Sequence, residues 1–215
     1  NTAVLFGDGA GAVVVEESKK EEDGEIFSFV NGLSSDKLDI LEVPNFGSAM
    51  DRFNKDEAAK VRWTFDGQEI FKGGIRAMAK ASDEVITKSG LKKEDINLLI
   101  PHQANLRIVE GLEKMLSLPN ATTIKKVHKY GNTSAASIPT ALVDALEEGE
   151  IKGGEVAVFT AVGAGLSWGA CALRLGERTT PINTSDAKLP DFDGKAVDTI
   201  RKAIEYQIPE KLDLI

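Results

Sequence analysis

The chain has 215 residues, of which 42% are hydrophobic and 28% charged, an ordinary composition for a soluble globular protein with one sizeable domain, alone or with an appendage. Its formal net charge of −8 argues against a nucleic-acid-binding protein, because no basic stripe is available to neutralise phosphates. No apolar run is long enough to span a bilayer, and no signal peptide is visible. The single cysteine excludes an internal disulfide framework and suits a reducing, cytoplasmic location.

The N-terminal part of the chain is predicted to be rich in strands. It opens on the apolar run TAVLFG without an initiator methionine, whereas natural N-termini are usually polar and loose. We interpret Asn1 as a cut inside a longer protein, with processing of a precursor as the alternative. The pattern predicts two strands, at residues 2–6 and 12–16, joined by a glycine-rich turn. It then predicts a solvated hairpin tip at 16–25, a further strand at 26–32 and an irregular segment at 41–62.

Helical and buried-strand patterns alternate through the middle of the chain. Apolar residues recur at helical spacing from residue 66 to 88, and Gly90 follows as a C-cap. In chain order the pattern then predicts a buried strand at 96–100, a helix at 106–116, a strand at 122–130, a helix at 131–148, and strands at 155–162 and 166–175. This alternation indicates an α/β layer fold.

After Leu175 the character of the sequence changes. The stretch GERTTPINTSDAKLPDFDG is polar and punctuated by prolines, as a linker is. The following residues place Val197, Ile200 and Ile204 on one face of a short amphipathic helix. Such a helix is expected to pack against another surface, on its own domain or on a partner chain, rather than to stay fully solvated. We therefore predict a linker and helical tail over residues 177–215, separate from a domain over residues 1–176.

His102 is the first candidate for chemistry. It follows the predicted strand INLLI and Pro101, at the carboxyl end of a strand, where open α/β sheets place their ligand sites. A neutral histidine can donate a ring N–H to a developing oxyanion, and it can also act as a base. For an isolated histidine, capping or packing a turn is the commoner role, so His102 alone does not indicate a catalytic site.

Two further motifs carry the same ambiguity. Asn132, in YGNTSAAS, precedes a predicted helix, where its side chain either caps that helix or donates an amide N–H into a cleft. Gly163 and Gly165, in AVGAGLSWGA, either form a plain hairpin or supply a backbone N–H to a substrate oxygen. Cys171 lies in an apolar strand without an acid or base beside it, which favours inert packing.

The motifs form a set that identifies a family. FGDGAGA lacks the lysine of a phosphate-binding loop and precedes a predicted strand rather than a helix, which argues against such a loop. Together, the order and spacing of FGDGAGA, PHQANLRI, YGNTSAASIPTAL and GAGLSWGACALRL resemble the C-terminal half of β-ketoacyl-acyl-carrier-protein (ACP) synthase III, from Asn1 to about Leu175. The resemblance implies a thiolase-like fold, with two related α/β halves in five αβαβα layers, assembled as a homodimer. It implies no metal and no cofactor, with a coenzyme A thioester as substrate.

The resemblance also implies a reaction. In similar enzymes a cysteine takes an acyl group from acyl-CoA, and malonyl-ACP then loses carbon dioxide and attacks that acyl thioester. By motif match, His102 and Asn132 correspond to the catalytic pair, two N–H donors that stabilise the enolate oxygen without needing to take a proton. Gly165 matches the loop that borders the acyl-thioester oxyanion hole.

Other matched positions concern substrate and partner. Asn105, Gly67 and Phe71 match positions that line the pantetheine and acyl channel. Arg107 matches a basic residue implicated in docking the acidic carrier protein, and a local positive group on an acidic protein is what such steering requires. Val162 stands where the family often has a bulky phenylalanine that limits the acyl pocket, which leaves the length and branching of the primer open.

The family's nucleophilic cysteine belongs to the N-terminal half, and Cys171 falls at a core position instead. The leading hypothesis is therefore the C-terminal catalytic portion of a synthase that initiates fatty acid biosynthesis, inactive by itself and exposing an apolar face where the missing half packs. One alternative is a related condensing enzyme of polyketide or specialised lipid biosynthesis. Another is a non-catalytic carrier-protein-binding subunit, although such a subunit would need neither His102 nor Asn132.

Overall fold

The computed structural model of the chain describes residues 5–20, 23–36, 38–43 and 64–180, together with residues 198 and 201. Nearly all of these belong to one compact unit, Asn1–Glu42 with Thr64–Pro181. Most of the predicted irregular segment 41–62 lies outside the described residues, and so does most of the predicted tail 177–215. Both therefore stay predictions.

A mixed five-stranded sheet forms the centre of this unit, with strand order β1-β7-β6-β4-β5. Strand β4 pairs in parallel with β5 and with β6, whereas β6 with β7 and β7 with β1 are antiparallel. A separate two-stranded sheet joins β2 to β3. The strands are β1 (Glu25–Leu33), β2 (Leu41–Glu42), β3 (Thr64–Phe65), β4 (Leu98–Pro101), β5 (Thr122–Thr123), β6 (Val156–Gly163) and β7 (Ser167–Arg174).

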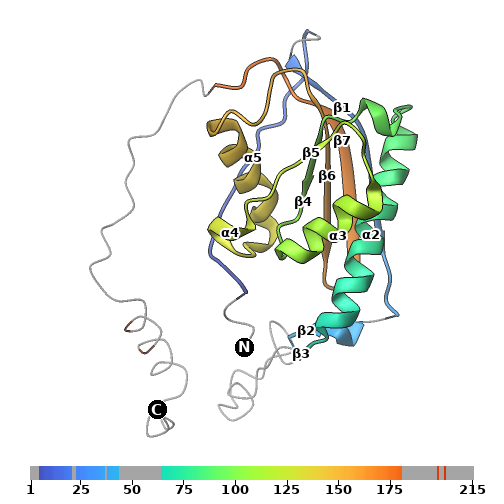
Figure 1. The fold of residues 1–215 in the computed structure, drawn as a ribbon, viewed down its shortest axis with the longest axis vertical. Helices are drawn as coiled ribbons and strands as arrows, with labels where there is room; N and C mark the ends of the chain where they lie inside the picture. The colour runs from blue at the N-terminus through green and yellow to red at the C-terminus, as the bar shows by residue number, and fades with distance from the viewer. Residues whose placement is uncertain are drawn as a thin grey trace, which may run out of the picture. The chain divides into compact units, whose positions relative to one another are not determined.

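Helices cover both faces of the five-stranded sheet (Figure 1). On one face, α2 (Gly67–Lys88) and α3 (Leu106–Leu116) pack on Leu99, Val158 and Ala172. On the other face, α5 (Ser137–Glu147) packs on Leu98, Ile100 and Ala157. Because successive strand residues point to opposite faces, the two sets of neighbours define two cores and a three-layer α/β/α arrangement. Short helices complete the path: η3 (Leu38–Ile40), η5 (Lys93–Asp95), α4 (Val127–Tyr130) and η6 (Ser134–Ala136).

Helix α2 illustrates why the sequence folds this way. Asp66 caps its first turn by accepting hydrogen bonds from the backbone N–H groups of Gln68 and Glu69, at 3.1 and 3.0 Å. The residue after the C-cap is Gly90, whose φ of +70° favours glycine. None of the helices in the described part of the chain is long and apolar enough to cross a membrane.

Most of the predicted elements are confirmed. The helices predicted at 66–88 and 106–116 correspond to α2 and α3, and the strands predicted at 26–32, 96–100, 155–162 and 166–175 correspond to β1, β4, β6 and β7. The helix predicted from residue 131 begins at Ser137, after a turn and η6.

Two predictions of strands are wrong. Residues 12–16 form no strand, and Val14 is 89% exposed. Of the strand predicted at 2–6 only Leu5 and Phe6 are described, and Phe6 makes an isolated parallel bridge with Asn132, so that strand stays a prediction. The strand predicted at 122–130 is shorter, because β5 ends at Thr123 and α4 begins at Val127. The Ile124 N–H still donates to the Leu99 carbonyl of β4, but the Ile124 carbonyl and the N–H groups of Lys126 and Val127 bond to the Gln103 side chain.

Candidate active site

His102 lies directly after β4, at the edge of the sheet where β4 and the parallel strand β6 end. Its backbone N–H donates to the carbonyl of Thr160 on β6 at 2.8 Å, which continues the ladder by one residue and fixes the direction in which the side chain leaves the sheet. The prediction that His102 lies at the carboxyl end of a strand is therefore confirmed. Such an edge of an α/β sheet is the usual place for a ligand site.

The imidazole of His102 is half-buried and contacts Ser137, the first residue of α5. Its Nδ1 lies 2.6 Å from the Ser137 Oγ. Burial lowers the pKa of His102 below its ordinary value, because desolvation disfavours the charged form. The ring is therefore neutral near neutral pH, with one N–H to donate and one nitrogen to accept.

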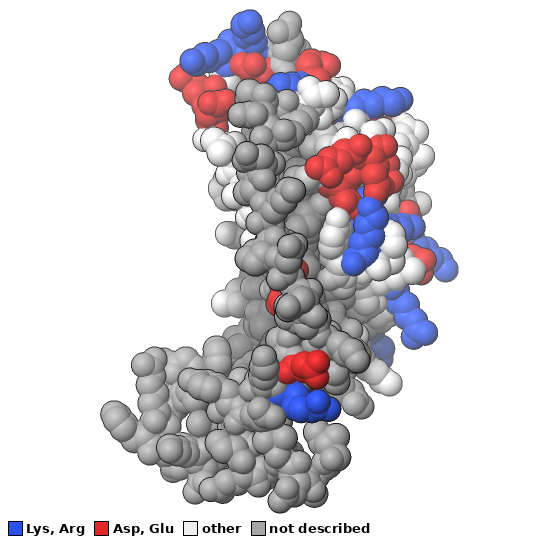
Figure 2. Space-filling view, turned by 90° about the vertical axis from the view of Figure 1, so that its left-hand side faces the viewer, with Lys and Arg blue, Asp and Glu red and all other residues white. Residues whose placement is uncertain are grey.

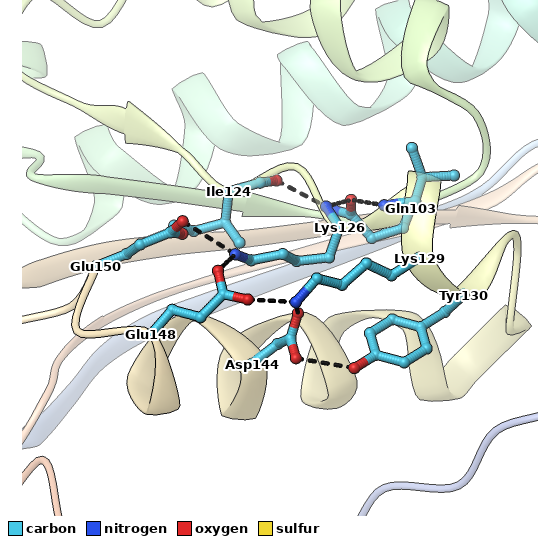
Figure 3. Close-up of polar contacts among 9 residues, drawn as sticks. Gln103, Ile124, Lys126, Lys129, Tyr130, Asp144, Glu148 and Glu150 are labelled. Atoms are coloured by element: carbon cyan, nitrogen blue, oxygen red, sulfur yellow. Dashed lines mark hydrogen bonds and ion pairs between the residues drawn. The ribbon is translucent and has the colours of Figure 1, made fainter.

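Gln103, which follows His102, has a structural role. Its side-chain N–H₂ donates to the carbonyls of Pro101 at 2.7 Å and Ile124 at 3.1 Å. Its Oε1 accepts from the backbone N–H groups of Lys126 at 2.8 Å and Val127 at 3.2 Å (Figure 3). The side chain, in a residue only 2% exposed, thus joins the end of β4 to the start of α4 and holds the chain in place beside His102.

Asn132 occupies a tightly held turn between α4 and η6. Its backbone N–H donates to the Leu5 carbonyl at 3.0 Å, and its carbonyl accepts from the Gly7 N–H, also at 3.0 Å. Its side-chain Oδ1 accepts from the Ser134 N–H at 2.9 Å. The amide oxygen is therefore occupied, as the capping interpretation expects, while the described residues offer no acceptor to the side-chain N–H₂, which leaves it able to donate to a substrate.

Glycines allow this turn to form. Gly131 has φ +68° and ψ −158°, a conformation that residues with a side chain rarely adopt. The loop FGDGAGA packs along the same segment: a Cβ on Gly9 would lie 3.0 Å from the Thr133 side chain, and one on Gly11 would lie 2.5 Å from Pro139. The glycines of this loop thus permit close approach to the Asn132 turn and to the start of α5.

Ion pairs hold α4 against α5 (Figure 3). The Lys126 Nζ, on a side chain only 5% exposed, lies 2.5 Å from a Glu148 carboxylate oxygen and 3.0 Å from one of Glu150. Lys129 also pairs with Glu148. Hydrogen bonds from Lys126 and Lys129 lower the pKa of Glu148 to about 2. On the side of the molecule where α5 lies in Figure 1, acidic and basic side chains adjoin one another (Figure 2).

Asp144 extends this network toward the Asn132 turn. It accepts from the Lys129 Nζ at 2.7 Å and from the Tyr130 hydroxyl at 2.8 Å. These hydrogen bonds raise the pKa of Lys129 and lower that of Asp144. Tyr130 and Gly131 directly precede Asn132, so the network fixes the chain immediately before the predicted catalytic amide.

The remaining predicted site residues lie at two other places. Asn105 is the N-cap of α3, where its Oδ1 accepts from the Ile108 N–H at 2.9 Å, and Arg107 is exposed in the first turn of that helix. Gly67 and the 36% exposed Phe71 belong to the first turns of α2.

Val162, near the end of β6, and Gly165, in the β6–β7 turn with φ +136°, lie on the sheet side of α2. The α2 glycines allow this approach, since a Cβ on Gly74 would lie 3.4 Å from Val162 and one on Gly73 would lie 2.9 Å from Leu166. Within the described residues, hydrogen bonds join His102 to the segment after Asn132 through Ser137, and none joins the Gly165 turn to them.

Sequence reasoning missed Ser137 as a site residue. It lies inside the quoted motif YGNTSAASIPTAL, but no local pattern indicates that its hydroxyl reaches across to β4. For Cys171, burial raises the pKa of the thiol, which makes a thiolate less available and agrees with the prediction of inert packing.

Two sequence models of one protein family match the chain. The model described as 3-oxoacyl-[acyl-carrier-protein (ACP)] synthase III C terminal matches residues 86–175, and the model described as 3-oxoacyl-[acyl-carrier-protein (ACP)] synthase III matches residues 1–34. The matched regions contain the FGDGAGA loop, His102, Asn132 and Gly165.

Similar proteins are known from several bacteria. Beta-ketoacyl-[acyl-carrier-protein] synthase III 2 of Vibrio cholerae is 46% identical over 211 residues, which cover 96% of this chain and 56% of that protein. Beta-ketoacyl-[acyl-carrier-protein] synthase III of Listeria monocytogenes is 46% identical over 176 residues, which cover 82% of this chain and 51% of that protein. The chain thus spans about half the length of these relatives. The Vibrio alignment also extends into residues 177–215, so part of that segment has a counterpart there.

Solved structures agree in fold. The chain matches 3-oxoacyl-(acyl carrier protein) synthase III of Pseudomonas aeruginosa with a TM-score of 0.72 and 35% identity, over 84% of this chain and 53% of that one. It matches the corresponding enzyme of Aquifex aeolicus with a TM-score of 0.67 and 39% identity, over 80% of this chain and 51% of that one.

Proposed function

Because the chain belongs to the 3-oxoacyl-ACP synthase III family, we propose that it is the C-terminal catalytic portion of an enzyme that condenses an acyl-CoA primer with malonyl-ACP to give 3-oxoacyl-ACP. This reaction initiates fatty acid biosynthesis. The observation that carries the proposal is the pair of N–H donors: a half-buried, neutral His102 at the end of β4, and an Asn132 amide whose oxygen is already occupied.

The chemistry requires such a pair. When the malonyl carboxylate leaves as carbon dioxide, the electron pair of the broken C–C bond moves into the thioester and places negative charge on its oxygen. Two N–H groups directed at that oxygen stabilise the charge, and each donor is typically worth about 3 to 4 kcal/mol of barrier. The enolate carbon then attacks the acyl thioester on the enzyme cysteine, and the cysteine thiolate leaves.

The remaining predicted residues receive supporting roles in this proposal. The turn at Gly165 borders the oxyanion hole of the acyl thioester, while Asn105, Gly67, Phe71 and Val162 line the channel for pantetheine and the acyl chain. Exposed Arg107 meets the acidic carrier protein, since it lies in the first turn of α3 just after the His102 strand end.

The intact enzyme in this proposal needs more than this chain. The chain spans about half of its relatives, and its one cysteine, Cys171, has a raised pKa. We place the nucleophilic cysteine in the N-terminal half, so that this chain by itself does not condense. The intact enzyme is a cytoplasmic homodimer with two thiolase-like halves in five layers.

The proposal is tested in the intact synthase that contains this chain. We expect His102→Ala and Asn132→Ala each to lower the rate of malonyl-ACP decarboxylation by about 10²- to 10³-fold, the usual effect of removing one oxyanion donor. Transfer of the acyl group from acyl-CoA to the cysteine should change far less.

His128→Ala is the matched control, because His128 is the other histidine of the chain and is exposed on α4. It should behave like the parent enzyme. If His102→Ala and Asn132→Ala also behave like the parent, the chain is a carrier-protein-binding subunit rather than part of a catalyst.

A further inference from the structure

We propose that Ser137 is a positioning residue that holds the neutral His102 ring in the tautomer with its proton on Nε2. The assignment follows from the hydrogen bonds around one buried hydroxyl. Its consequence for catalysis rests on the function proposed above. Only this tautomer has an N–H that points away from Ser137 and can donate to a substrate oxygen.

The Ser137 hydroxyl is enclosed and has few partners. Ser137 is 2% exposed, and its Oγ lies 2.6 Å from the His102 Nδ1. The same oxygen accepts the backbone N–H of Gln103 at 3.2 Å. Within the described residues these are its only hydrogen bonds, so the hydroxyl proton has one available acceptor, the Nδ1 of His102.

The Ser137 hydroxyl differs from other hydroxyls on the helices in the kind of partner that it has. Serine and threonine in helices commonly donate to a backbone carbonyl in the preceding turn. Thr140, on the same helix, does this with the Ala136 carbonyl at 2.8 Å, and Ser82 on α2 does so with the Met78 carbonyl, also at 2.8 Å. Ser137, at the start of α5, instead joins its helix to the residue that follows β4.

The opposite arrangement leaves a buried group unsatisfied. If Nδ1 carried the proton, both it and the Gln103 N–H would donate to the Ser137 oxygen, and the hydroxyl proton would have no acceptor in a nearly inaccessible site. A buried donor without a partner is costly. A doubly protonated ring meets the same difficulty, so the serine favours the neutral ring with Nδ1 as acceptor and Nε2–H as donor.

A spectroscopic measurement tests the assignment without reference to activity. In the intact synthase labelled with ¹⁵N-histidine, the His102 ring signals are identified by their loss in His102→Gln. We expect a protonated Nε2 and an unprotonated Nδ1 in the parent, and a mixture of tautomers in Ser137→Ala. A proton on Nδ1 in the parent, or an unchanged tautomer in Ser137→Ala, would overturn the proposal.

Kinetics test the consequence. Ser137→Ala should lower malonyl-ACP decarboxylation by about 10-fold, the usual net worth of one good hydrogen bond, and should move the acid limb of the rate toward higher pH. Ser137→Thr, which keeps the hydroxyl, should restore most of the rate. Thr87→Ala is the control, since the Thr87 hydroxyl bonds only within α2, to the Asp83 carbonyl.

The outcomes separate the two proposals. Equal losses in Ser137→Ala and Ser137→Thr would show that the residue acts only through packing, which overturns the positioning role. If the tautomer is as expected but His102→Ala decarboxylates normally, the proposed function fails while the assignment of the ring stands.

Discussion

At the scale of single residues, the site depends on which atoms are already engaged. The side-chain oxygen of Asn132 and the Nδ1 of His102 both have hydrogen-bond partners inside the protein. The Asn132 N–H₂ group and the His102 Nε2 therefore point away from these partners. The residue types and their order along the chain are visible in the sequence. The hydrogen bonds that these side chains make are not visible there, because Ser137 and His102 are separated in the chain by the whole of α3 and α4.

The pH dependence of decarboxylation follows from His102. Burial lowers its pKa, so the neutral ring persists as pH falls through 6.5, the ordinary value, and is lost only below it. The unfolded chain takes up its proton first, so the folded state also loses stability as pH falls below 6.5. We expect the acid limb of kcat to lie below 6.5, measured by carbon dioxide release from malonyl-ACP in the intact synthase. An acid limb at or above this value that depends on His102 would contradict the prediction.

Gly131 offers a sharper test of how the Asn132 turn is held. Alanine there must adopt a conformation almost restricted to glycine, which costs about 1 to 3 kcal/mol or shifts the chain. We expect Gly131→Ala to lower decarboxylation by about 10-fold or more, because small displacements of a catalytic group are costly.

Gly149→Ala is the control for Gly131→Ala. Gly149 also has a positive φ, +72°, but lies in open space after α5, so alanine there should cost stability and spare the rate. Similar rates for the two variants would show that the Gly131 conformation does not position Asn132.

At the scale of secondary-structure elements, periodicity predicted the long helices and the paired strands well. It failed where a side chain from elsewhere in the chain takes the backbone groups: Gln103 bonds to the Ile124 carbonyl and to the N–H groups of Lys126 and Val127, so the predicted strand does not continue past β5, and nothing in the local sequence indicates this. It also failed at residues 12–16, which form no strand.

Asn105 has a capping role that can be separated from its proposed place in the substrate channel. Asn105→Ala removes the side-chain acceptor for the Ile108 N–H and should cost about 1 kcal/mol of stability, read from the midpoint of urea unfolding. Asn105→Asp keeps the acceptor and should unfold like the parent. A lower affinity for acyl-CoA in the aspartate variant, at full stability, would support the channel role; equal unfolding of parent and alanine variants would contradict the capping role.

The α4–α5 ion pairs predict a loss of stability in acid. The pKa of Glu148 is lowered from 4.5 to about 2, so its contribution is present above 4.5 and is lost as pH falls from 4.5 toward 2. We expect the Tm to fall over this range, and to fall less steeply in Glu148→Gln, measured by circular dichroism. Identical slopes for the two proteins would show that Glu148 contributes nothing to the acid transition.

At the scale of the whole molecule, four motifs sufficed to predict the family and its α/β, thiolase-like fold, and the family models and solved structures confirm both. The described chain forms three layers, but α5 covers only part of its face of the sheet. Phe29, Cys171 and Phe159 lie in one row across β1, β7 and β6 on that face. Phe159 packs against the α5 core, whereas Phe29 is 66% exposed, and Leu33 farther along β1 is 69% exposed.

This uncovered row predicts the behaviour of the chain when it is produced alone. Exposed apolar side chains on an edge strand favour association. We expect the isolated chain to sediment as species larger than 23.1 kDa, and Phe29→Lys with Leu33→Glu to shift it toward the monomer in analytical ultracentrifugation. Met115→Lys, on α3 and 51% exposed, is the control and should leave the distribution unchanged. A monomeric parent chain would contradict the prediction.

The two backbone hydrogen bonds that Asn132 makes with Leu5 and Gly7 have a consequence for recognising active relatives. The turn that holds Asn132 takes its shape from a segment far earlier in the chain, so under the proposed function a homologue can retain histidine, asparagine and glycine motifs and still lack the segment that orients the asparagine. A search for functional members of this family should therefore treat the FGDGAGA loop as part of the active site, and natural variation in that loop as variation in catalytic competence.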